Sequence, residues 1–314
     1  MTQIPLKKRS SRYGVVAKLW VSGVLIFVLM LIYEPLFFTK NTLMQINTNE
    51  FVDSKGVNMR LVPQGTFTMG NRPYEAYQAC MNLSGHCTAT FDEEGPPHQV
   101  YLNAYYMDTY EVTNALYKTC MDSSWFCTAP GNSVTSLNVI NHYADSKFDE
   151  YPVVHITWDQ ARAFCEWRSA RLPTEAEWEK AARGTDGRIY PWGDTFDGTK
   201  TNSCDKNCTD VPPSPSYDDG YVESAPVGSY LQGISPYKIY DLAGNVKEWV
   251  ADWYDEKYYQ GSPLNNPQGP LWGFYHVQRG GSWRNDGSLL RATTRGWNSG
   301  ADYLTGFRCA RSAP

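Results

Sequence analysis

The sequence predicts an α+β domain with short strands, a few helices and long stretches of loop. Three observations support this class: apolar and polar residues alternate in two early segments, three helical segments follow, and after Gly184 the helical periodicity disappears. Glycine, proline, asparagine and aromatic residues dominate that last part in short runs, which is typical of loops between short strands. With 314 residues, of which 42% are hydrophobic, the chain can bury one large core.

The N-terminal part resembles a membrane-inserting segment. Five basic residues precede an apolar run from Leu19 to Tyr33, which resumes at Leu36 to Phe38. A cleaved signal peptide and a buried core helix are the alternatives, but no small-residue cleavage site follows the run, and the basic cluster argues against a core helix. Positive charges keep the preceding end in the cytoplasm. We therefore expect a cytoplasmic N-terminus (1–18), a single-pass transmembrane signal anchor (19–38), a linker (39–56) and an extracytoplasmic domain (57–314), periplasmic or extracellular.

The first elements of the domain should be strands. Apolar residues alternate from Met59 to Asn71 around Pro63-Gln64-Gly65, which predicts a hairpin with a tight turn. The segment from His98 to Asp108 also alternates and predicts a further strand.

Three helices follow, each preceded by a threonine. Thr113, Thr157 and Thr174 lie at the predicted starts, and a glutamine or glutamate three residues after the second and third completes a capping box. Gly184 should end the third helix, because glycine is the residue best suited to the position after a helix.

Cysteine content and charge limit the chemistry further. All eight cysteines follow the predicted anchor, which favours disulfides in an oxidising compartment; zinc is the rival explanation, but Cys-x2-Cys spacing is missing. Local pairs are plausible from spacing, although spacing leaves the connectivity open: Cys80 with Cys87, Cys120 with Cys127, and Cys204 with Cys208. The formal net charge of -5, with scattered basic residues, argues against nucleic acid as a partner.

Eight short motifs, read in order, resemble the formylglycine-generating-enzyme (sulfatase-modifying factor) family. They are Met69-Gly70, Tyr110 to Asn114, Pro152 to Val154, Arg171 to Glu179, Tyr190 to Gly193, Asp241 to Trp249, Arg279 to Trp283, and Gly306 to Ala310. The resemblance implies that family's compact fold, an elaborated relative of the C-type lectin fold. Taken alone, most of the motifs are explained by structure; Trp178, for example, is expected in the core.

The resemblance also implies that the two copper-binding cysteines of the family are missing from this chain. Catalytic members hold copper with two cysteines that follow the Arg-Gly-Gly-Ser motif, and they convert a sulfatase cysteine to formylglycine with oxygen. Those two positions fall on Asn285 and Leu290, and neither side chain replaces a thiolate. Copper-dependent formylglycine synthesis is therefore not expected. The remaining downstream cysteine, Cys309, matches a family cysteine that forms a structural disulfide to the position of Cys165.

Calcium is the cofactor that the resemblance retains. Family members bind two calcium ions through oxygen atoms, which suits a hard cation. By position, the first set of ligands is Asn202, Ser203, Asp219 and Tyr221, with Ser203 and Tyr221 contributing carbonyl oxygens. The second set is Asp241, Gly244, Val246 and Glu248, with Gly244 and Val246 contributing carbonyl oxygens.

Two functions remain open from the sequence. The first is a non-catalytic binding or scaffold protein that recognises a peptide, a glycan or a partner protein, which the aromatic-rich loops favour. The alternative is an oxidoreductase or other enzyme with altered chemistry in the old groove. In that region Asp286 and Arg291 could form an ion pair or bind substrate, and His276 is the only histidine in the last third of the chain.

Overall fold

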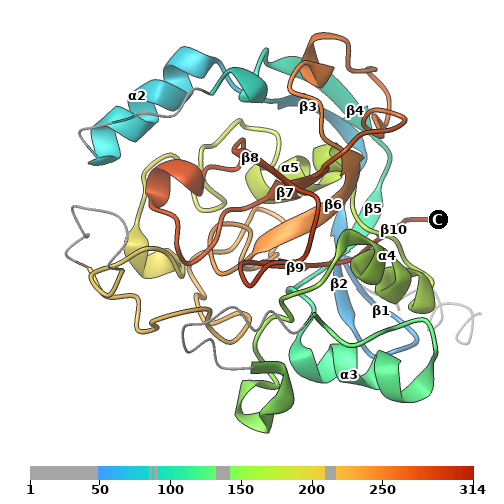
Figure 1. Ribbon diagram of the computed structural model, residues 1–314. Coiled ribbons are helices and arrows are strands. Elements are labelled where there is room, and N and C mark those ends of the chain that lie inside the picture. Colours follow the sequence, from blue (N-terminus) through green and yellow to red (C-terminus); the bar gives the residue numbers. More distant parts are fainter. Residues whose placement is uncertain (1–48, 85–86, 88–90, 132–141, 209–216) are drawn as a thin grey trace, which may run out of the picture. The chain divides into compact units, whose positions relative to one another are not determined.

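The computed structural model describes residues 49–84, 87, 91–131, 142–208 and 217–314, which belong to one compact unit that starts at Asn49 (Figure 1). Among these residues, the helices are all too short or too polar to cross a membrane. The anchor expected at 19–38 lies outside the described residues.

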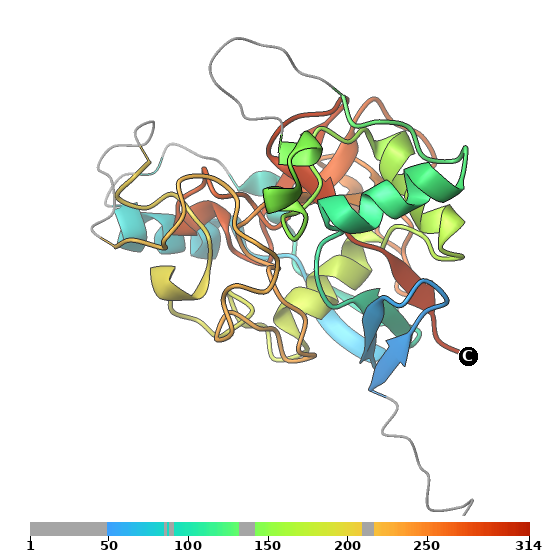
Figure 2. The ribbon, with the colours of Figure 1, turned by 90° about the horizontal axis from the view of Figure 1, so that it is seen from below.

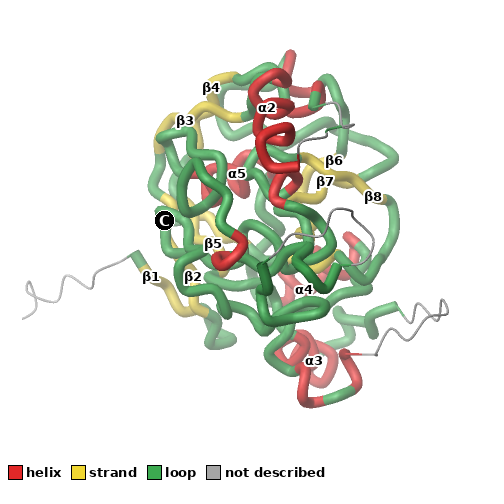
Figure 3. The backbone as a smooth tube through the Cα atoms, turned by 90° about the vertical axis from the view of Figure 1, so that its left-hand side faces the viewer, coloured by secondary structure: helices red, strands yellow, loops and turns green. Residues whose placement is uncertain are grey.

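Short elements and long loops make up the unit, as the sequence predicts, and Figure 3 shows how much of the backbone is loop. The described helices are α2 (Pro73–Ser84), α3 (Asn114–Ser123), α4 (Trp158–Trp167) and α5 (Glu175–Arg183). The described strands are β1 (Glu50–Val52), β2 (Asn58–Val62), β3 (Gly65–Met69), β4 (His98–Leu102), β5 (Tyr105–Asp108), β6 (Lys247–Trp253), β7 (His276–Arg279), β8 (Arg295–Asn298), β9 (Thr305–Phe307) and β10 (Ala310–Ser312). The loops therefore carry most of the candidate site residues.

The strands form three sheets. One has the order β1-β2-β5-β10, the second pairs β3 with β4, and the third has the order β8-β7-β6-β9. In the first sheet the last strand, β10, pairs with β5, so the C-terminal residues lie beside the N-terminal strands (Figure 2). In the third sheet β9 runs parallel to β6, and the other neighbours are antiparallel.

Two expectations about the N-terminal strands were wrong. Glu50 to Val52 pair with β2, so the domain begins at or before residue 50 and the linker does not extend to 56. The predicted hairpin from Met59 to Asn71 does not form either: β2 pairs with β1 and β5, whereas β3 pairs with β4. Alternation shows that a segment suits a strand, but it does not identify the partner.

The three predicted helices are confirmed with their caps. The side chains of Thr113, Thr157 and Thr174 accept a backbone N–H at each helix start, and both capping boxes form. Gly184 follows α5 with a positive φ of 69°, as the C-terminal glycine should. Helix α2 was not predicted.

Helix α5 is buried along its whole length and organises charged side chains inside the protein. All nine of its residues are buried, and its three glutamates form ion pairs. Glu175 pairs with Arg295, Glu177 with Arg171, and Glu179 with Arg279. The motif that contains α5 is therefore structural, and Trp178 is a core residue as expected.

The buried hydrophobic residues form two large cores. One joins β2 to β5 with α5 and the third sheet, and the other joins α3 and α4 to Trp249 and Phe307. Four disulfides form among the described residues: Cys80–Cys87, Cys120–Cys127, Cys165–Cys309 and Cys204–Cys208. The cysteines of the second and third belong to the second core. Both cores and all four disulfides are built from residues of the unit that starts at Asn49.

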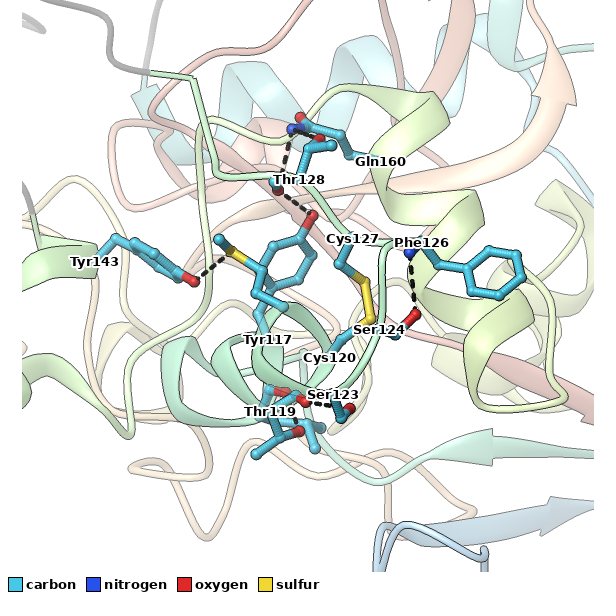
Figure 4. The surroundings of a disulfide bond; sticks show 12 residues. Tyr117, Thr119, Cys120, Ser123, Ser124, Phe126, Cys127, Thr128, Tyr143 and Gln160 are labelled. Atoms are coloured by element: carbon cyan, nitrogen blue, oxygen red, sulfur yellow. Dashed lines mark hydrogen bonds between the residues drawn. A yellow bond between two sulfur atoms is a disulfide. The ribbon is translucent and has the colours of Figure 1, made fainter.

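The Cys120–Cys127 disulfide closes the loop that follows α3 (Figure 4). Beside it, the Tyr117 hydroxyl donates to the Thr128 carbonyl at 2.9 Å, and Gln160 of α4 donates to the same residue. The ring of Phe126 points away from the disulfide. The disulfide and these bonds attach the loop to α3 and α4.

Candidate functional site

Asn285, the first of the two positions where a copper-binding cysteine is expected to be missing, lies in a turn. Asn285 Oδ1 accepts hydrogen bonds from the backbone N–H and the hydroxyl of Ser282, both at 2.9 Å. The Asn285 carbonyl accepts from the N–H of Cys204 at 3.0 Å. Asn285 therefore has a structural role: it closes the turn and joins it to the Cys204–Cys208 loop.

The second position is filled by packing. Leu290 is fully buried beside Tyr190 and Ala243, with Trp192 and Phe196 packed against this cluster. Its Cδ2 lies 2.5 Å from the point that a Cβ on Gly281 would occupy. A buried aliphatic side chain has no donor atom, so the Leu290 side chain cannot be a metal ligand.

Asp286 and Arg291 do not pair with each other, so the ion pair considered for them was wrong. Arg291 is fully buried and makes a bidentate ion pair with Glu94, with both N–O distances at 2.6 Å. Asp286 accepts from the N–H and hydroxyl of Ser288 and so caps a short 3-10 turn. Both side chains stabilise the fold.

His276 lies between two tryptophans. Its ring stacks on Trp158 at a centroid distance of 3.8 Å and on Trp253 at 3.6 Å. Burial lowers the pKa of His276 to about 4, because the charged imidazolium would lose its hydration. The residue is a neutral ring in a stack, as expected of a lone histidine in a packed region.

The first calcium set comes together around Asp219. Both of its carboxylate oxygens accept backbone N–H groups, from Ser203 at 2.8 Å and from Tyr221 at 2.9 Å. Burial raises the pKa of Asp219 to about 6, and the carboxylates of Asp205 and Asp218 add to the rise. A cation bound here would favour the charged form of the Asp219 carboxylate and so oppose this rise in its pKa.

An unsatisfied oxygen lies in the same set. Asn202 is buried, and its Nδ2 donates to the Glu223 carbonyl at 3.0 Å. Its Oδ1 accepts no well-formed hydrogen bond among the described residues, and the Tyr230 hydroxyl is the polar group that lies near Asn202. A buried amide oxygen without a donor is costly, and calcium prefers such an oxygen. The first set therefore fits calcium.

The second set is arranged differently. Glu248 is fully buried and makes a bidentate ion pair with Arg308, at 2.6 and 2.7 Å, and also accepts from Trp178 Nε1 at 2.9 Å. Asp241 Oδ2 accepts from the N–H of Gly228 at 2.6 Å. Because the Glu248 carboxylate already has three donors, the second set fits calcium less well than the first.

The two calcium sets meet where the backbone of Asn202 contacts the backbone of residues 244 and 245. The N–H of Asn245 donates to the Asn202 carbonyl at 2.9 Å, and a Cβ on Gly244 would lie 2.1 Å from that same oxygen. Only glycine permits this approach. No group of three or more histidine, cysteine, aspartate or glutamate side chains within the described ranges is arranged to hold a metal ion. Any calcium here would therefore use carbonyl and amide oxygens as well.

Glu111 was not identified from the sequence as part of this region. It is buried, it accepts from Asn245 Nδ2 at 3.2 Å, and its Oε1 has no hydrogen-bond donor in the part of the chain that is described. Burial raises the pKa of Glu111 well above its usual range, and the Asp241 carboxylate adds to that effect. The only sequence signal for Glu111 is its position in the family motif Tyr110 to Asn114, and that motif does not specify a role for it.

The chain matches the family described as the sulfatase-modifying factor enzyme 1-like domain over residues 47–313. It is 32% identical to the formylglycine-generating enzyme of Streptomyces coelicolor over 291 residues, which cover 80% of this chain and 88% of that protein. It is also 41% identical over 173 residues to the inactive C-alpha-formylglycine-generating enzyme 2 of Bos taurus, covering 52% of this chain and 51% of that protein.

Among solved structures, PvdO from Pseudomonas aeruginosa superposes with a TM-score of 0.66 at 23% sequence identity. The match covers 84% of this chain and 98% of that one. At this identity the likeness concerns the fold alone, and it confirms the loop-rich α+β fold that the resemblance implied.

Proposed function

Because the chain belongs to the sulfatase-modifying factor enzyme 1-like family, we propose that it is a non-catalytic member that acts by binding rather than by oxidation. The observation that carries the proposal is the state of the two copper positions. Asn285 closes a turn on Ser282, and Leu290 fills a core. Copper(I) selects soft thiolate ligands, and neither residue supplies one.

The cysteines support the same proposal. All eight are paired in the structure, so no other cysteine can supply a thiolate in place of positions 285 and 290. A relative that carries the word inactive in its name, the Bos taurus protein, shares 41% identity with this chain. That name indicates that loss of catalysis has occurred elsewhere among similar proteins.

Calcium is the proposed structural cofactor. The first set would hold it through Asn202 Oδ1, the Asp219 carboxylate and the carbonyls of Ser203 and Tyr221. The orphaned amide oxygen and the raised pKa of Asp219 support this assignment. When bound, the ion would supply the positive charge that this half-buried carboxylate lacks.

The proposed location is the outer side of a membrane. Residues 19–38 would form a signal anchor with its N-terminal side in the cytoplasm, and the domain would follow outside. Four disulfides support an oxidising compartment, because cytosolic proteins rarely keep them. The ligand would then be an extracytoplasmic peptide, glycan or protein.

The test is an oxidation assay on a sulfatase-motif peptide. The domain is incubated with copper, oxygen and a reductant, and the peptide is analysed by mass spectrometry, with the Streptomyces coelicolor enzyme as the positive control. We expect formylglycine only in the control. Formylglycine in the sample with this domain, above a copper-only blank, would refute the proposal and favour the enzyme with altered chemistry.

A further inference from the structure

The loop that follows Ser203 is closed on itself by a disulfide. Cys204 and Cys208 are four residues apart, and the N–H of Cys208 also donates to the Asp205 carbonyl at 3.0 Å. The Asp205 side chain lies inside this loop, and only 2% of the residue is exposed. An aspartate is rarely buried to this extent unless its carboxylate is hydrogen-bonded.

The Asp205 carboxylate accepts hydrogen bonds from two parts of the chain. Asn207, inside the same loop, donates its backbone N–H to Oδ1 at 2.7 Å and its side-chain amide to Oδ2 at 3.0 Å. The backbone N–H of Asp219 donates to Oδ2 at 3.0 Å. Asp219 is the carboxylate of the first calcium set, so Asp205 joins the disulfide loop to a proposed calcium ligand.

Further hydrogen bonds hold the same two segments together. Asp219 Oδ2 accepts the N–H of Ser203, the residue before Cys204, at 2.8 Å. The N–H of Lys206 donates to the Tyr217 carbonyl at 3.0 Å, and the Tyr217 hydroxyl donates to the Cys204 carbonyl at 2.9 Å. The geometry of Asp219 and that of the disulfide loop therefore depend on each other.

The loop is also fixed to the rest of the domain. Cys204 is 1% exposed, and its N–H donates to the Asn285 carbonyl at 3.0 Å. The disulfide thus ties Cys208 to a residue that is already held in place. Fixing a loop before its ligand arrives improves binding, because the cost of ordering the loop is not paid at the binding step.

We infer that the Cys204–Cys208 disulfide and Asp205 preorganise the first calcium set. Asp205 is a positioning residue that acts through the backbone of Asp219, and the disulfide keeps Asp205 and the Ser203 carbonyl in place. The inference rests on the proposed calcium site and adds residues that the resemblance did not identify. Calcium binding then depends on formation of this disulfide, so the first set is complete only in an oxidised chain.

The size of the effect follows from general magnitudes. Replacing a residue that orients a metal ligand through a hydrogen bond typically weakens metal binding about 10–100-fold. For a disulfide that closes so short a loop, the chain-entropy argument gives at most about 30-fold in an equilibrium constant. Both effects are large enough to measure.

The experiment is calorimetric titration of residues 49–314 with calcium; these residues form one compact unit with all four disulfides. Asp205→Asn keeps the shape of the side chain but has one carboxylate oxygen fewer to accept hydrogen bonds, and it should weaken calcium binding about 10–100-fold. Asp218→Asn is the matched control for the lost charge. Asp218 precedes Asp219, but its side chain is 46% exposed and pairs with Lys206, so its replacement should change the affinity less than about threefold.

The disulfide is tested separately. Replacing both Cys204 and Cys208 by alanine should weaken calcium binding several-fold, up to about 30-fold. Replacing both Cys80 and Cys87 by alanine is the control, because that disulfide also joins nearby cysteines, seven residues apart, and lies in a different cluster. The control should bind calcium as the unchanged domain does.

Thermal unfolding separates positioning from a general loss of stability. If Asp205 only stabilised the fold, Asp205→Asn would lower the unfolding midpoint equally with calcium and with a chelator. The inference predicts a larger loss with calcium, because weaker binding gives less stabilisation.

The outcomes distinguish this inference from the proposed calcium site. Calcium binding by the unchanged domain, with equal affinity in Asp205→Asn or in the variant that lacks Cys204 and Cys208, would overturn the inference and leave the site in place. A loss in Asp218→Asn as large as that in Asp205→Asn would also overturn it, because charge alone would then explain the effect. An unchanged domain that binds no calcium would overturn both.

Discussion

The buried ion pair between Glu248 and Arg308 gives the sharpest prediction about stability. Both side chains are fully buried, the two N–O distances are 2.6 and 2.7 Å, and the Arg308 guanidinium also donates to the carbonyls of Asp108 and Tyr240. Glu111 and Asp241 lie close enough to act on the same arginine. One guanidinium therefore faces three carboxylates.

Arg308→Met would leave these carboxylates without their cation. Removing one partner of a buried pair costs about 3–5 kcal/mol, because the other charge stays buried and uncompensated. We expect that loss in the free energy of unfolding, measured by guanidinium titration at neutral pH with disulfides intact and with a chelator present. The chelator prevents any bound calcium from masking the change.

Two controls test the reasoning. Glu248→Leu combined with Arg308→Met should lose less stability than Arg308→Met alone, because the Glu248 carboxylate is then no longer left buried without its cation. Arg162→Met should change stability by less than about 1 kcal/mol, since the Arg162–Glu166 pair lies at the surface with both side chains about half exposed. A cost for Arg308→Met as small as that of Arg162→Met would refute the argument.

Three further predictions follow from the same structure. The pKa of His276 is about 4 in the folded state and about 6.5 in the unfolded state, so between these pH values the unfolded chain binds the extra proton. The free energy of unfolding should therefore fall as the pH is lowered from about 6.5 to about 4. His276→Phe should reduce this pH dependence in a series of denaturation curves, and an unchanged pH dependence would contradict the prediction. Loss of the Cys165–Cys309 disulfide should lower the free energy of unfolding by about 2–3 kcal/mol more than loss of Cys80–Cys87, because the first disulfide joins cysteines 144 residues apart and the second joins cysteines 7 apart. Both losses are measured by denaturation of variants in which the two cysteines are replaced by alanine, and equal losses would contradict the chain-entropy argument. Calcium should raise the thermal unfolding midpoint of the domain, and Asn202→Ala should abolish this rise if the first set binds the ion. An equal rise in the unchanged domain and in Asn202→Ala would exclude Asn202 as a ligand.

The parts of the fold that local chemistry determines were predictable. Helices α3, α4 and α5 each begin at a threonine cap and carry a clear apolar face, so their starts could be read directly from the sequence. Helix α2 was missed because its cap is not apparent and its buried face is little more than Ala76 and Cys80.

Long-range pairing was not predictable from pattern. The partner of β2 is β5, more than forty residues later in the chain by the register of Met59 with Asp108, and alternation carries no information about that distance. The ion pairs around α5 and Glu248 likewise join segments that are remote in sequence. For the site, the resemblance located Asn285 and Leu290, but the turn and the packing that make them structural appear only in three dimensions.

We propose that positions 285 and 290 do not hold copper, and an anaerobic titration with copper(I) in the presence of a competing chelator tests this proposal most directly. With Asn285 and Leu290 at the ligand positions and all eight cysteines in disulfides, the domain should take no copper from the chelator. The Streptomyces coelicolor enzyme should bind it under the same conditions. Tight, stoichiometric copper binding by this domain would contradict the account.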